Sequence, residues 1–120
     1  FGMQAGIAAY REGGPWLAEV LATLATHRTL VVDGVASMPG VRTIANEGTY
    51  LQWLDFTALE LDEEPSEWLL REAKVALNPG VPFGAAPHTH ARLNFGTTRP
   101  LLEQGLEQIA AAVSARCGGG

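Results

Sequence analysis

Apolar residues in the first third of the chain recur at the three- and four-residue spacing of an α-helix. Residues 2–10 predict a short helix that "EGG" at 12–14 interrupts, after which Pro15 suits the first turn of a longer helix. The apolar positions of the longer helix are Leu17, Val20, Leu21, Leu24, Val31 and Val35. We expect them to form one buried stripe as far as residue 36, because "SMPG" at 37–40 ends the helical pattern.

The next segment has the composition of two β-strands joined by a turn. "VRTIA" (41–45) and "TYLQWLDF" (49–56) are rich in β-branched and aromatic residues, and the "NEG" between them is typical of a turn. We therefore expect an antiparallel hairpin. The apolar residues of the second strand alternate between its two faces, with Leu51 and Trp53 on one face and Tyr50, Leu54 and Phe56 on the other. This pattern predicts that both faces are covered.

The second half of the chain predicts a helix, two strands and a final helix. Acidic residues before Pro65 favour a helix over 65–74, since negative charge is stabilised at a helix N-terminus. The later elements are a short strand in "VALNPG" (75–80), the proline- and glycine-rich loop 78–87, a strand at about 90–96 and a helix from Thr98 and Pro100. The predicted buried stripe of this last helix is Leu102, Leu106, Ile109 and Val113.

This order of elements predicts an α/β fold of the α+β type, a two-layer sandwich. Helices should pack on one face of a small, mostly antiparallel sheet. The chain has 120 residues, enough for one domain with a real core. We expect residues 1–36 to be a helical lead-in and residues 41–115 to be the core of the sandwich.

Composition excludes several classes of partner. Thirteen acidic against eight basic residues give a net charge of −5 without any cluster of lysine and arginine, so nucleic acid is not an expected partner. No apolar run approaches the ~20 residues of a membrane span, so a membrane is not expected either. Cys117 is the only cysteine, which fits a cytoplasmic protein and leaves no cysteine-based metal site. The opening "FGMQAG" lacks an initiator methionine, and we expect a fragment of a larger protein.

The predicted strand at 90–96 contains the most informative polar residue. Ala91, Leu93 and Phe95 share one face, which leaves Arg92 and Asn94 on the other. The residues alone allow two roles for Arg92, a surface ion pair or the binding of an anion. The ion pair is favoured, because surface arginines more often form one. Asn94 either orients Arg92 or bonds to backbone or solvent.

Other candidate residues have structural interpretations that we favour. His88 and His90 have a spacing that suits two metal ligands, but no third ligand lies nearby in the sequence, so no metal site is predicted. Tyr50 and Trp53 are expected in the core rather than in a substrate pocket. Cys117 is expected to be inert.

Four segments taken together resemble a known enzyme family. They are "AAYREGGPWL" (8–17), "EGTYLQWLDF" (47–56), "LLREAKVALNPGVPFG" (69–84) and "ARLNFGTTRPLLEQGLEQI" (91–109). In order and spacing they resemble the carboxy-terminal small domain of fold-type-I pyridoxal-phosphate (PLP) enzymes of the aspartate-aminotransferase fold, nearest to the cystathionine β-lyase or C–S lyase branch. Thr57 departs from the pattern, because many relatives have arginine after "WLDF".

The resemblance implies a role for Arg92 as the residue that binds the α-carboxylate of an amino-acid substrate. It implies a full-length homodimer that uses pyridoxal 5′-phosphate to release pyruvate, ammonia and a thiol from cystathionine or a cysteine conjugate. The cofactor site and its lysine belong, in the family, to a large domain outside these residues. Lys74, the only lysine, is not in the family's cofactor motif, so neither a cofactor-binding nor a catalytic residue is expected here.

Two rival functions remain open at this stage. An aminotransferase would share the fold and the carboxylate-binding arginine. A binding module without catalytic activity would need neither a large domain nor a cofactor.

Overall fold

The computed structural model describes residues 1–119 and contains the elements predicted from the sequence. The helices are α1 (Gly2–Glu12), α2 (Gly14–Ala36), α3 (Pro65–Glu72) and α4 (Arg99–Gly118). The strands are β1 (Arg42–Thr43), β2 (Leu51–Asp55), β3 (Asn78–Pro79) and β4 (His90–Asn94). Two short 3₁₀ turns, η1 (Thr57–Leu59) and η2 (Val81–Phe83), follow β2 and β3.

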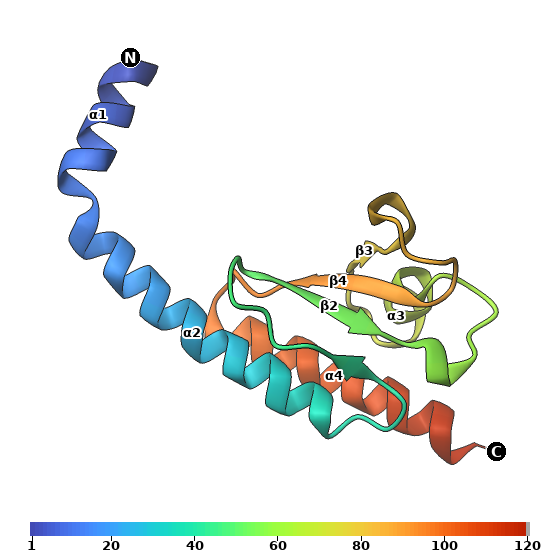
Figure 1. The fold of residues 1–120 in the computed structure, drawn as a ribbon. Helices are drawn as coiled ribbons and strands as arrows, with labels where there is room; N and C mark the ends of the chain where they lie inside the picture. The colour runs from blue at the N-terminus through green and yellow to red at the C-terminus, as the bar shows by residue number, and fades with distance from the viewer. Residues whose placement is uncertain (120) are drawn as a thin grey trace.

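The strands form one antiparallel sheet in the order β1-β2-β4-β3. The central pair joins Trp53 to Arg92 and Leu54 to Ala91. Helices α2 and α4 run side by side beneath the sheet, and α3 packs near β3 and β4 (Figure 1). The two-layer α/β sandwich predicted from the order of elements is therefore confirmed.

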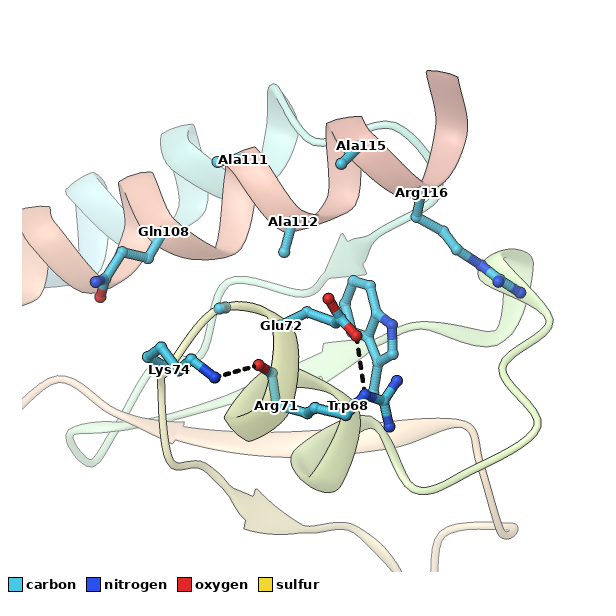
Figure 2. Close-up of a pocket in the computed structure, with 10 residues that line it drawn as sticks. Trp68, Arg71, Glu72, Lys74, Gln108, Ala111, Ala112, Ala115 and Arg116 are labelled. Carbon is cyan, nitrogen blue, oxygen red and sulfur yellow. Dashed lines mark hydrogen bonds and ion pairs between the residues drawn. The ribbon is translucent and has the colours of Figure 1, made fainter. Parts of the chain in front are cut away.

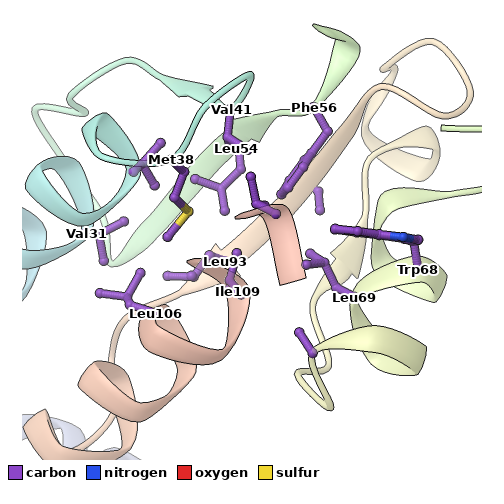
Figure 3. Close-up of a cluster of buried hydrophobic side chains, with 14 of the residues drawn as sticks. Val31, Met38, Val41, Leu54, Phe56, Trp68, Leu69, Leu93, Leu106 and Ile109 are labelled. Atoms are coloured by element: carbon purple, nitrogen blue, oxygen red, sulfur yellow. The ribbon is translucent and has the colours of Figure 1, made fainter. Parts of the chain in front are cut away.

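The hydrophobic core lies between the sheet and the helices (Figure 3). It takes Val31 and Val35 from α2, and Trp68 and Leu69 from α3. The predicted α4 stripe is confirmed, and its four members are all buried: Leu102, Leu106, Ile109 and Val113. From β2 and β4 the core receives Leu54, Ala91 and Leu93, with Phe56 and Phe95 just beyond the strands.

The predicted stripe of the long helix is only half right. Val31 and Val35 are buried, whereas Leu17 and Leu21 are 49% and 56% exposed. The reason is visible in Figure 1, where α1 and the first half of α2 extend away from the sheet as an arm. Helix periodicity identifies the apolar side of α2, but among residues 1–119 only its C-terminal half meets the core.

Among residues 1–119, only one of the two faces of β2 that were expected to be covered is buried. The helices cover the face that bears Leu54, while Trp53 on the other face is only half-buried. Tyr50 precedes the strand and is 49% exposed, so it is not a core residue. Gln52 is fully buried on the core side, where its amide nitrogen donates to the Ile44 carbonyl at 2.6 Å, while its Oε1 has no partner among the described residues.

The strand expected within residues 75–80 is shorter than predicted. Only Asn78 and Pro79 pair with β4. Lys74 has φ +58°, which ends α3 in a left-handed conformation, and Val75 and Leu77 then pack against the core without joining the sheet. None of the helices within residues 1–119 is both long enough and apolar enough to cross a membrane.

The exposed apolar arm leads to the first prediction. Its large exposed side chains are Phe1, Met3, Ile7, Tyr10, Trp16, Leu17 and Leu21. Contiguous apolar surface of a few hundred Å² usually marks an interface, so the isolated chain should self-associate and bind a hydrophobic dye. Sedimentation velocity over a range of concentrations measures the association, and circular dichroism checks the fold.

The combined variant Trp16→Ser with Leu21→Ser should weaken the association. Leu101→Ser is the matched control, because Leu101 is 59% exposed on α4 and lies outside the arm. A wild-type chain that stays monomeric at every concentration and binds no dye would contradict the prediction.

Candidate functional site

Arg92 lies on the face of the sheet that the helices leave open. The strand alternates, with Ala91 and Leu93 buried towards the helices and Arg92 half-buried on the other side. Antiparallel pairing places Arg92 between Trp53 of β2 and Asn78 of β3 in one cross-strand row. The predicted orientation of Arg92 away from the core is therefore confirmed.

Two neighbours hold the guanidinium of Arg92. Its Nη2 donates to Oδ1 of Asn78 at 3.1 Å, and its Cζ lies 4.1 Å from the centre of the Phe83 ring. Phe83 in turn meets Trp53 edge to face, with ring centres 6.3 Å apart and planes at 86°. The Arg92 head group is thus confined by an amide on one edge and an aromatic ring against it.

Arg92 makes no ion pair with any acidic side chain among residues 1–119. Its Nε is buried and has no hydrogen-bond partner in this part of the chain. A protein with a net charge of −5 offers many acids, so a half-buried arginine without one is unusual. The surface ion pair considered from the sequence does not form here.

A tight turn after β3 brings Phe83 to Arg92. The Gly80 N–H donates to the His90 carbonyl at 3.0 Å, and an added Cβ at Gly80 would lie 2.6 Å from that oxygen, so only glycine permits this close approach. The turn η2 is closed by the bond from Phe83 N–H to the Gly80 carbonyl at 2.9 Å. Gly84 then adopts φ +91°, a conformation that favours glycine.

A second group of polar residues lies at the far end of the central strand pair. His90 stacks on Trp53 with ring centres 5.4 Å apart, and its Nε2 lies 3.9 Å from Asp55 Oδ1. Partial burial raises the pKa of Asp55, but hydrogen bonds from Thr57 and the nearby charges of His90 and Arg42 outweigh burial and leave the pKa lowered. Thr57, the departure from the family pattern, donates its N–H to Asp55 at 2.8 Å.

The remaining sequence candidates have structural partners. His88 donates its N–H to Glu64 at 3.0 Å, and Asn94 accepts from the Gly96 N–H at 2.8 Å rather than orienting Arg92. No cluster of three His, Cys, Asp or Glu residues suitable for a metal occurs within the described range. Cys117 is exposed near the end of α4. Sequence reasoning missed Asn78 and Phe83, because a cross-strand partner and a 3₁₀ turn leave no periodic signal.

The cavity between α3 and α4 is large, about 660 Å³, but its cations are already engaged (Figure 2). Lys74 Nζ donates to the Arg71 carbonyl at 2.8 Å, and Arg71 pairs with Glu63 and Glu72 at 2.6 and 2.8 Å. Arg116 reaches the Glu60 carbonyl at 3.3 Å. Lys74 and Arg116 thus bind backbone carbonyls and Arg71 binds carboxylates, so the cavity is not a ready anion site.

Lys74, the only lysine in the sequence, lies apart from Arg92. A Schiff base needs a free lysine amine, and the only lysine, Lys74, bonds to a carbonyl on the helix side of the sheet, whereas Arg92 lies on the open side.

Comparison with known proteins identifies the relatives of this chain. It is 39% identical to cystathionine β-lyase of Corynebacterium glutamicum over 93% of this chain and 30% of the relative. Its likeness to the PLP-bound C–S lyase of Staphylococcus hominis has a TM-score of 0.82 at 26% identity, over 89% of this chain and 29% of that chain. Aspartate aminotransferase of Pyrococcus horikoshii is 29% identical over 91% of this chain and 29% of its own length. No family model matches.

These findings confirm the resemblance seen in the sequence. The chain matches the carboxy-terminal region of fold-type-I PLP enzymes and spans about 30% of the length of the relatives it matches. Both lyases and aminotransferases occur among those relatives.

The lowered pKa of Asp55 predicts a pH-dependent contribution to stability. A carboxyl whose pKa is lower in the folded state stabilises the fold above its unfolded pKa, about 3.9, and loses this contribution as the pH falls through the folded pKa. Asp55→Asn should therefore unfold at lower urea than wild type at pH 7, and the difference should shrink at pH 3. Asp33→Asn, at an exposed position of α2, is the control. A difference between Asp55→Asn and wild type that grew towards acid pH would refute this assignment.

Proposed function

We propose that this chain is the carboxy-terminal small domain of a PLP-dependent C–S β-lyase, in which Arg92 binds the α-carboxylate of the amino-acid substrate. The observation that carries the proposal is the Arg92 site, where an arginine without an acidic partner is fixed by Asn78 and Phe83 on an open sheet face. The match to cystathionine β-lyases supports the reaction class. Residues 1–36 would be the lead-in and residues 41–115 the core of this small domain.

The chemistry of arginine suits this role. A guanidinium presents a planar fork of N–H donors that matches the two oxygens of a carboxylate, which a lysine cannot reproduce. Arg92 lies on β4, whose neighbours Ala91 and Leu93 are fixed in the core, so its backbone cannot shift easily. A carboxylate held at this point would fix how the rest of the amino acid is presented to the reacting groups.

The remainder of the enzyme would supply the catalytic parts. PLP, which stabilises negative charge at the substrate's α-carbon, would bind with its lysine in a large domain that closes over the open face of this sheet. The overall reaction would be β-elimination from cystathionine or a cysteine conjugate to pyruvate, ammonia and a thiol. We further propose that the full-length protein is a homodimer and that residues 1–120 alone are inactive.

An aminotransferase is the second candidate, because the chain also matches aspartate aminotransferase of Pyrococcus horikoshii. Both functions would use Arg92 in the same way. A binding module without catalysis is a third possibility from a different class. It predicts a reading frame that lacks the expected upstream domain of roughly twice the length of this chain, as judged from the fraction of each relative that is matched.

The full-length protein with cystathionine distinguishes these functions. A lyase should release pyruvate and a free thiol in equal amounts, because one C–S bond breaks for each pyruvate formed. Lactate dehydrogenase measures the pyruvate and a thiol reagent measures the sulfur product. Transfer of the amino group to an oxo acid without thiol release would show an aminotransferase, and neither reaction would favour the binding module.

Replacement of Arg92 tests the site. Arg92→Ala leaves the substrate carboxylate unpaired, and truncation of one partner of such a pair costs roughly 2–5 kcal/mol, or about 30- to 5000-fold in kcat/KM. Arg92→Lys should recover only part of the loss. Arg99→Ala is the matched control, since Arg99 pairs with Glu103 on the surface of α4 at 2.7 Å.

Folding should survive the Arg92 substitutions, because the side chain lies outside the core. Melting temperature and cofactor absorbance should therefore remain close to wild type. Near-normal kcat/KM in Arg92→Ala, or a loss explained by unfolding alone, would overturn the assignment of Arg92.

A further inference from the structure

Phe83 is an exposed aromatic residue in a rigid setting. Phe83 is 52% exposed, so burial in the core does not explain its position. The turn that carries it is nevertheless anchored to β4, because the Gly80 N–H donates to the His90 carbonyl. Two successive backbone bonds close the turn, from the Phe83 N–H to the Gly80 carbonyl at 2.9 Å and from the Gly84 N–H to the Val81 carbonyl at 3.0 Å. The ring is therefore held at a defined place on the surface.

The Phe83 ring lies against the guanidinium of Arg92. The 4.1 Å separation between Arg92 Cζ and the ring centre lies well within the range of a cation–π interaction. Trp53 packs edge to face against the same ring and limits its rotation. Asn78 holds the Nη2 edge of the guanidinium, so ring and amide act on different parts of one head group.

We propose that Phe83 is a positioning residue that holds Arg92 ready for a carboxylate, a proposal that rests on the proposed function. An unsupported arginine has many rotamers, and binding an anion would have to select one of them. The ring confines the guanidinium before substrate arrives and displaces water from one side of it, which strengthens attraction to a carboxylate. An aliphatic side chain of similar size lacks the negative π face that attracts the cation.

The first experiment replaces Phe83 in the full-length enzyme. Phe83→Leu should lower kcat/KM about 3- to 30-fold, the range expected from loss of a cation–π contact, and the change should fall mainly on KM. Phe83→Tyr should stay near wild type because it retains the ring. Val81→Ala is the matched control, since Val81 belongs to the same turn and is 44% exposed. Melting temperature should be unchanged in all three.

A readout other than turnover uses propionate, an unreactive carboxylate, as a competitive inhibitor. Phe83→Leu should raise the inhibition constant of propionate by a factor similar to its effect on KM. If Phe83→Leu is poorly folded, Phe83→Met serves as the second aliphatic replacement. Unchanged KM and unchanged propionate inhibition in a folded aliphatic variant would overturn the proposal.

A double-mutant cycle separates positioning from an independent role. If Phe83 acts through Arg92, Phe83→Leu should cause no further loss in the Arg92→Ala background. Losses that multiply would show that Phe83 acts independently, which overturns the positioning role and leaves the role of Arg92 intact. An Arg92→Ala enzyme with normal activity would instead overturn both this inference and the proposed function.

Discussion

The pairing of β2 with β4 is the constraint on which the rest of the structure depends. It fixes Leu54 opposite Ala91 and Trp53 opposite Arg92, so that one set of side chains enters the core and the other set faces away. A slip of one residue would exchange the faces and put an arginine among Phe56, Leu69 and Ile109. The burial of Ala91 and Leu93 against the helices therefore specifies the orientation of Arg92. The register of β2 and β4 thus determines both the packing of the core and the position of Arg92.

The helices cover only one side of the sheet. The hydrophobic core therefore lies on that side, and Arg92 lies on the other. On the covered side, buried residues of α2, α3 and α4 meet those of β2 and β4, and the buried amide nitrogen of Gln52 donates to the Ile44 carbonyl. On the open side, the Phe83 ring lies against Arg92, and Trp53 contacts both Phe83 and His90. In the cavity between α3 and α4, Lys74 and Arg116 donate to backbone carbonyls and Arg71 pairs with carboxylates.

Sequence patterns predict the elements and the direction of Arg92, but not its surroundings. Period-two alternation is enough to place Ala91 and Leu93 inside, and helical spacing identifies all four buried residues of α4. Periodicity cannot show where a neighbouring element ends, which is why Leu17 and Leu21 were expected to be buried and are exposed. Asn78 and Phe83 meet Arg92 through strand register and a glycine-dependent turn, and both contacts depend on tertiary structure. The proposed role of Arg92 in carboxylate binding rests on family resemblance, since the residues alone favour an ion pair.

The arrangement around Arg92 also explains why an arginine can remain half-buried without an acid. Desolvation of a charge is costly unless other groups replace part of its hydration. Asn78 replaces one hydrogen bond and the Phe83 ring supplies a region of negative potential, so the cation is compensated without being neutralised. An aspartate at position 78 would compensate the charge more completely, but it would also cancel the positive potential that the proposed carboxylate site needs. A neutral amide and an aromatic ring hold the guanidinium in place and leave its full charge available to an incoming anion.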